Sequence, residues 1–322
     1  MKEETKRIIV FFAVSAVFSW LFVAVYLIFG GEQGGGGANF MMIPYVLVPG
    51  IAAFVIQKFI YHEPLRPDLG LYFKPNRWFF IAWIVAAAAI FAINEVGLRL
   101  PWHEYSPGMK GFLARIEATR GPEVADQMTM AIDTMPFDFF WLLVVQGMIS
   151  GLTIGAVVAL FEELGFRGFV MRQLRGSGFW KIALTTGVLW GVWSAPIVLL
   201  GYHYPEHIAA GLGMMPLYCL LASPIYTYFR MRSGSVVASA IFGGTFSGMS
   251  AIPLLYIEGG SNLTAGVTGL AGLIVLAVLN ILIVLFDRLV ADEPLTAAVP
   301  IGRDENVDES PEETRDVTDY QA

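Results

Sequence analysis

Runs of about 20 apolar residues recur along this 322-residue chain, and they limit the folds that it can adopt. A helix needs about 20 residues to cross the hydrocarbon core of a bilayer, because each residue adds about 1.5 Å. The chain is 56% hydrophobic and only 15% charged, which excludes an ordinary soluble domain. We therefore expect an all-α fold, a polytopic membrane helix bundle of about eight transmembrane helices. The candidate segments are residues 8–29, 40–61, 78–98, 137–160, 179–200, 214–229, 235–256 and 267–286.

Positively charged residues are distributed unevenly between the two sides of such a bundle. With the amino terminus inside, 16 of the 20 Lys and Arg residues fall on the inner side and four on the outer side. Cytoplasmic loops carry an excess of Lys and Arg, so this count predicts a multi-pass protein of the cell membrane with both termini in the cytoplasm. The four outer charges lie in one long connection, residues 99–136. We expect an extracellular loop there, with amphipathic helices as the alternative.

Composition divides the chain into three parts. Residues 1–136 hold the first three predicted spans and the long outer loop, and residues 137–290 hold the remaining spans as a membrane core. Residues 291–322 contain ten acids and two arginines, a net charge of −8, whereas the whole chain has a net charge of −7. This composition predicts an acidic, disordered cytoplasmic tail. The single cysteine, Cys219, lies in an apolar segment, so we expect it to pack in the core.

Two adjacent acids and an arginine follow the fourth predicted span, in the sequence FEELGFRG (161–168). On a helix, Glu163 and Arg167 are four residues apart and can form an ion pair, whereas Glu162 lies about 140° away from the arginine. One carboxylate is then neutralised while its neighbour stays available as a base. Charges within a membrane usually serve a function, but charges at the end of a span need not. Topology alone leaves both interpretations open.

Four downstream segments extend this motif: GVLWGVWSAP (187–196), GYHYP (201–205), RSGSV (232–236) and AIFGGTFS (240–247). With these motifs in this order and spacing, residues 152–249 resemble the CAAX protease and bacteriocin-processing family of intramembrane proteases. The resemblance implies an eight-helix membrane bundle in which a glutamate activates a water molecule that attacks a peptide carbonyl. It further implies that Glu162 is this base and that Glu163 and Arg167 support it.

Two further motifs of that family contain histidine, and this chain departs from both. Trp190 and Ser194 stand at the aromatic-x-x-x-His motif, and Gly243 and Ser247 stand at the His-x-x-x-Asn motif. A serine hydroxyl can donate one hydrogen bond but cannot become a cation, and glycine has no side chain. We expect these four residues to line the substrate cavity. Because both motif histidines are replaced, we expect no metal and no other cofactor.

The histidines that the chain does contain are not expected to replace the missing ones. His62 and His103 lie outside the similar segment. His203 and His207 follow the fifth predicted span on its outer side, whereas Glu162 is predicted near the cytoplasmic side. A catalytic partner must come within hydrogen-bond reach of the reacting atoms. For His203, beside two tyrosines, packing at the membrane interface is the expected role.

Two functions from different classes follow from these observations. The first is an intramembrane CAAX-type endopeptidase that cleaves a peptide or lipid-modified protein near the cytoplasmic face, with Glu162 as the base. The second is a catalytically silent relative, a pseudoenzyme that binds a membrane protein partner or acts as a scaffold. The expected partners are accordingly a peptide or lipid-modified substrate or a membrane protein, together with the lipid bilayer, and no nucleic acid.

Overall fold

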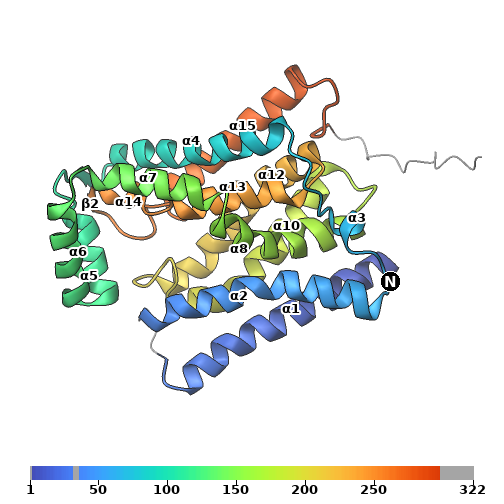
Figure 1. The fold of residues 1–322 in the computed structure, drawn as a ribbon, viewed down its shortest axis with the longest axis horizontal. Helices are drawn as coiled ribbons and strands as arrows, with labels where there is room; N and C mark the ends of the chain where they lie inside the picture. The colour runs from blue at the N-terminus through green and yellow to red at the C-terminus, as the bar shows by residue number, and fades with distance from the viewer. Residues whose placement is uncertain (1, 32–35, 298–322) are drawn as a thin grey trace, which may run out of the picture.

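The computed structural model describes residues 2–31 and 36–297, which form an all-α bundle (Figure 1). Within these residues, seven segments are long and apolar enough to cross a membrane. An eighth crossing is counted if α6 (Pro122–Thr134) and α7 (Phe139–Ser150), which meet at a bend of 101°, form one span. The predicted polytopic bundle is confirmed. The seven segments are α1 (Glu3–Ile28), α2 (Gly36–Val55) with η1 (Ile56–Ile60), α4 (Arg77–Arg99), α10 (Phe179–Trp193) with α11 (Ala195–Leu199), α12 (Ile208–Ser233), α13 (Val236–Gly248) with α14 (Ile252–Leu255), and α15 (Leu270–Leu289).

The predicted fourth span, residues 137–160, is divided into two helices. α7 ends at Ser150, a turn follows, and α8 (Ile154–Glu163) begins a new helix. This helix continues without a break through the π-helix η2 (Leu164–Val170) and α9 (Met171–Gln173). Hydropathy does not reveal the break, because residues on both sides of the turn are apolar. Glu162 and Glu163 therefore lie near the middle of a continuous helix, about 30 Å long.

Two other spans also differ from their predicted form. α12 is longer than the predicted segment 214–229. Its two prolines, Pro216 and Pro224, lie inside the helix and do not end it. Membrane helices tolerate interior proline where neighbouring helices satisfy the freed backbone groups. The predicted span 235–256 is interrupted after α13, and its last turn forms the short helix α14.

α13 is the central helix of the bundle. It packs against α8 and α4, and with α14 it is the most buried of the seven candidate spans. A Cβ added to Gly244 would lie 2.5 Å from the backbone nitrogen of Ala156, so α13 and α8 approach each other closely. α2 packs against α8 as well, and Figure 1 shows α8 between α2 and α13.

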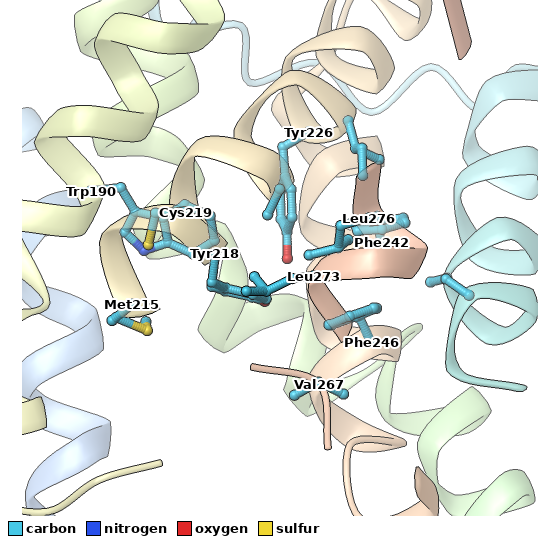
Figure 2. Packing of buried hydrophobic residues seen from close by; sticks show 14 of the residues in the cluster. Trp190, Met215, Tyr218, Cys219, Tyr226, Phe242, Phe246, Val267, Leu273 and Leu276 are labelled. Carbon is cyan, nitrogen blue, oxygen red and sulfur yellow. The ribbon is translucent and has the colours of Figure 1, made fainter. Parts of the chain in front are cut away.

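An aromatic core fills the space among α10, α12 and α13 (Figure 2). The ring centroid of Tyr226 lies 5.6 Å from that of Trp190 and 4.9 Å from that of Phe242. Tyr218 lies 5.9 Å from Trp190, measured in the same way. Cys219 is fully buried within this cluster and is a free thiol, which confirms its predicted role in packing.

The long connection between α4 and α7 is folded. β1 (His103–Tyr105) pairs antiparallel with β2 (Ile257–Gly259), and α5 (Lys110–Arg120) leads into α6. The guanidinium of Arg115 donates hydrogen bonds to the carbonyls of Ile257 and Gly259, each at 2.9 Å. The expectation of a plain extracellular loop is wrong, and the alternative of helices is observed. These elements lie at one end of the bundle, away from the amino terminus (Figure 1).

A cluster of charges lies at the opposite end of the bundle, around α3 (Arg66–Leu69). Glu63 accepts a hydrogen bond from Arg7 at 2.8 Å and another from Arg172, and Arg172 also pairs with Asp68 at 3.1 Å. Burial alone would raise the pKa of the Glu63 carboxyl, but the hydrogen bonds from both arginines hold it below its ordinary value. This cluster ties the start of α1 to the end of α9.

The first part of the predicted tail packs against the bundle. Asp287, on α15, accepts a hydrogen bond from the backbone N–H of Thr296 at 2.7 Å and pairs with Arg232 on α12. The side chain of Thr296 is buried. Residues 291–297 are therefore folded back onto the helices, and the remainder of the predicted tail, residues 298–322, lies outside the described residues.

Candidate active site

A cavity of about 410 Å³ inside the bundle contains most of the residues expected at the site. Residues that are far apart in the sequence meet there, as the motif order implies. Arg167 does not line the cavity and contacts Glu163 instead. The expected residues that line it are Glu162, Glu163, Trp190, Ser194, Gly243 and Ser247.

The cavity lies mainly in one half of the bundle. Its lining includes Met42 near the start of α2, Ile154 at the start of α8, Trp193 at the end of α10 and Ser247 at the end of α13. These helix ends are directed toward the end of the bundle where α5 and α6 lie (Figure 1). The lining is largely apolar, which suits a ligand with an apolar chain or side chains. Its apolar members include Val46, Val158, Ile197, Met215 and Val267.

Arg167 and Glu163 form a buried ion pair on the helix that carries the acids. Nη1 of Arg167 donates to Oε1 of Glu163 at 3.0 Å, and Nη2 donates to the hydroxyl of Ser223 at 3.1 Å. The guanidinium lies over the rings of Trp190 and Tyr226, each centroid at 4.9 Å. Arginine stacks on aromatic faces in this way and keeps its charge when buried. The predicted pairing of Glu163 with Arg167 is confirmed.

Glu162 has a different environment from its neighbour. It lines the cavity, and among the described residues it makes no hydrogen bond and no ion pair. A carboxylate at this depth in a membrane protein is costly unless it serves a wet cavity or a ligand. The two adjacent acids thus have separate roles in the structure, one compensated by arginine and one open to the cavity.

Ser194, at the position of the first motif histidine, is bound to its own helix. Its hydroxyl donates to the carbonyl of Trp190 at 2.9 Å, and its side chain is buried. This hydroxyl is therefore not free to donate to a ligand unless that bond breaks. The carbonyl of the preceding residue, Trp193, accepts a hydrogen bond from the hydroxyl of Tyr45 on α2. The end of α10 is consequently fixed against α2.

Gly243, at the position of the second motif histidine, faces the ring of Tyr226. A Cβ built on Gly243 would lie 3.1 Å from Cε1 and 3.2 Å from the hydroxyl oxygen of Tyr226, and 3.4 Å from the Cβ of Ala159. The tyrosine therefore occupies the volume in which a side chain at residue 243 would begin. Ser247, one turn later on α13, is exposed and lines the cavity.

The cavity also contains four residues that the sequence did not indicate. His203 was expected on the side away from Glu162, but it lines the same cavity, as do Tyr202, Tyr218 and Tyr226. Burial lowers the pKa of the His203 imidazole to about 4, which keeps it neutral. The segment GYHYP held a signal for His203, since it belongs to the motif series. The tyrosines on α12 lie in an apolar helix and carry no local signal.

The carboxylates in the cavity do not resemble a metal site. Among the described residues, no group of three or more His, Cys, Asp and Glu side chains is placed to hold a metal ion. Of the two acids in the cavity, Glu163 already binds Arg167. Structural and catalytic zinc sites use at least three protein ligands. These residues therefore do not fit a metal ion.

Comparison with protein families gives one match that agrees with this geometry. Residues 135–249, about a third of the chain, match the family model described as Type II CAAX prenyl endopeptidase Rce1-like. This segment runs from α7 to α13, and within it α8, η2, α10 and α13 carry the expected site residues except Ser194, which directly follows α10. Over this segment the chain is similar to that family of endopeptidases, in agreement with the resemblance that the motifs carry. Neither the curated proteins nor the solved structures include a match.

Proposed function

We propose that this membrane protein is an intramembrane endopeptidase in which Glu162 activates the attacking water. The observation that carries the proposal is the open carboxylate of Glu162 on the cavity wall, beside a Glu163 that is compensated by Arg167. A free base next to an anchored acid is the arrangement that general-base catalysis needs. The likeness to Type II CAAX prenyl endopeptidases supports a peptide or lipid-modified protein as substrate.

The reaction needs one water molecule and one peptide bond. Glu162 takes a proton from the water, and the resulting hydroxide attacks the carbonyl carbon, which places negative charge on the carbonyl oxygen. Glu162 then returns the proton to the leaving nitrogen as the C–N bond breaks. The products are a carboxylate and an amine. Arg167 holds Glu163 in place next to the proposed base.

The position of the cavity within the bundle indicates the side from which a substrate enters. The charge distribution of the loops favours cytoplasmic termini, and the cavity lies toward the end of the bundle away from the amino terminus. Entry from the outer half of the bilayer follows from these two observations. This proposed side of entry differs from the cytoplasmic face expected from sequence.

Hydrolysis by purified protein in lipid tests the proposal. The substrates are a mixed library of prenylated and unmodified peptides, and the comparison is between the native chain and Glu162→Gln. The amide keeps the shape of the side chain but cannot act as a base, so we expect cleavage to disappear while the protein remains folded. Glu95→Gln is the matched control, because Glu95 lies in an exposed ion pair with Arg99 on α4. Equal cleavage by the native chain and Glu162→Gln, or none by either, would contradict the proposal.

A silent binding protein is the second candidate, and the two replaced motif positions favour it. Ser194 bonds to its own helix and Gly243 faces the ring of Tyr226, so neither position offers an imidazole. A chain of this kind would retain the cavity and bind a lipid-modified peptide or membrane protein without cleaving it. Binding of the library peptides to folded protein, with no cleavage above that of Glu162→Gln, is the result that distinguishes it.

A further inference from the structure

We propose that Tyr226 donates the hydrogen bond that stabilises the carbonyl oxygen of the substrate in the transition state. This inference rests on the proposed function, because it names the group that works opposite Glu162. Hydrolysis by a single base leaves the developing negative charge on the carbonyl oxygen unsupported, and one preorganised donor there typically contributes about 10² to 10³ in rate. The second motif histidine of the resembled family is replaced in this chain by Gly243, which has no side chain.

The position of the tyrosine hydroxyl is the first argument. It lies 3.2 Å from the point at which a side chain on Gly243 would begin, so it occupies the space of the replaced motif residue. Tyr226 comes from α12, whereas Gly243 is on α13. The two helices are neighbours in the bundle. A donor from one helix has thus taken the place of a residue from the next.

The availability of the hydroxyl is the second argument. Tyr226 lines the cavity together with Glu162, and its hydroxyl has no hydrogen-bond partner among the described residues. Figure 2 shows this side chain extending from α12 with its hydroxyl directed away from its own backbone. By contrast, the hydroxyls of Ser194 and Tyr204 are already used by the carbonyls of Trp190 and Thr268. A phenolic hydroxyl is a good donor and remains neutral at physiological pH.

The rigidity of the ring is the third argument. Trp190 and Phe242 pack against it at centroid distances of 5.6 and 4.9 Å, and the guanidinium of Arg167 lies 4.9 Å from its centroid. The backbone carbonyl of Tyr226 accepts a hydrogen bond from Ser239 at 3.0 Å. Arg167 also holds Glu163, next to the proposed base. One arginine therefore fixes both sides of the site, which is the preorganisation that a transition-state donor needs.

Steady-state hydrolysis by Tyr226→Phe tests this role. The substitution removes only the hydroxyl and keeps the ring that packs against Arg167. We expect kcat to fall by about 10² to 10³. KM and the thermal midpoint are expected to stay close to those of the native chain. Tyr228→Phe is the matched control, because Tyr228 is also a buried tyrosine of α12 but does not line the cavity, and we expect it to change kcat by less than about tenfold.

Each other outcome overturns the inference in a recognisable way. Native turnover in Tyr226→Phe, with Glu162→Gln inactive, removes the role of Tyr226 and leaves the proposed function standing. Equal losses in Tyr226→Phe and Tyr228→Phe also contradict it. Absence of cleavage by the native chain removes the proposed function and the inference together. If Tyr226→Phe does not fold, 3-fluorotyrosine at residue 226 decides, because it keeps ring and hydroxyl and changes only the acidity of the donor. If kcat with 3-fluorotyrosine equals the native value, Tyr226 does not act as the donor to the carbonyl oxygen.

Discussion

The carboxylate of Glu163 and the guanidinium of Arg167 lie 3.0 Å apart, and both side chains are almost completely buried. Removing one partner of a buried ion pair leaves the other charge uncompensated, which typically costs about 3 to 5 kcal/mol. We therefore expect Glu163→Ala to lower the free energy of unfolding by about this amount. The thermal midpoint of the purified protein in detergent is the measurement, and a midpoint equal to the native one would contradict the structural role of this pair.

The pair of Glu95 and Arg99 provides the control for that experiment. It has the same four-residue spacing and a distance of 2.6 Å, but both side chains are more than half exposed. Exposed pairs contribute about 0 to 1 kcal/mol. Glu95→Ala should therefore leave the midpoint nearly unchanged. Burial, and not the presence of an ion pair as such, makes the difference between the two substitutions.

Restoring the second motif histidine should destabilise the protein. A Cβ at residue 243 would lie 3.1 to 3.2 Å from the ring and hydroxyl of Tyr226, which is tighter than ordinary van der Waals contact. Gly243→His therefore forces the tyrosine to move, and overpacking of this kind costs about 1 to 3 kcal/mol. The sequence motif alone would suggest the opposite, that this substitution improves the site.

A double-mutant cycle checks this explanation. Tyr226→Ala removes the ring and leaves a cavity, so by itself it is destabilising as well. In the double variant Gly243→His, Tyr226→Ala, the imidazole enters the vacated space, and we expect the loss of stability to be smaller than the sum of the single losses by more than about 0.5 kcal/mol. Additive losses would show that the two residues do not compete for the same volume.

Much of this architecture follows from local patterns in the sequence. Apolar segments near the length of a bilayer core predict helices, and the spacing of Glu163 and Arg167 predicts their ion pair. Both depend on residues close together in the chain. The motif order placed Glu162 and Ser194 in one cavity only through the resemblance to a family, because no local rule relates residues on separate helices.

The features that sequence did not predict depend on tertiary contacts or on breaks within apolar runs. The turn after Ser150 lies between two apolar helices, so hydropathy places Glu162 at the end of a span although it lies within a helix. Tyr226 contributes to the site because α12 packs beside α13, and nothing in its own segment indicates this. His203 was expected away from Glu162, but the loop after α11 folds so that both residues line one cavity.

Gly244 should be intolerant of any side chain. A Cβ there would lie 2.5 Å from backbone atoms of Gly155 and Ala156, and backbone cannot move aside as a side chain can. Gly244→Ala must therefore separate α13 from α8, at a cost of about 1 to 3 kcal/mol or more.

Gly213 on α12 is the control for Gly244→Ala, since a Cβ there meets nothing within 4 Å. Gly213→Ala should leave stability unchanged or raise it by about 0.5 to 1 kcal/mol. Equal midpoints for the two variants would contradict the close packing.

Cysteine labelling tests the proposed orientation in the membrane. Ser247 is exposed and lines the cavity, whereas Lys58 is exposed on η1, near the charge cluster that contains Arg7. We expect a membrane-impermeant maleimide to label Ser247→Cys in intact cells and Lys58→Cys only after lysis. The native Cys219 is fully buried and supplies the background. The reverse pattern would place the amino terminus outside and the cavity opening toward the cytoplasm.

The stability of the protein should depend on His203 in weakly acidic solution. Burial lowers the pKa of this imidazole from 6.5 to about 4 in the folded protein. Between these two values the unfolded chain binds a proton that the folded chain does not, so stability falls as the pH decreases through this range. His203→Asn removes the titration, and asparagine tolerates the positive φ of 67° at this residue. We expect the thermal midpoint to fall less between pH 7 and pH 5 in His203→Asn than in the native chain.

His207→Asn, at an exposed residue of the same loop, is the control, and its thermal midpoint should fall as much as that of the native chain. If the loss in His203→Asn equals the native one, the acid sensitivity arises elsewhere, and the imidazole is not held neutral by its place in the cavity wall.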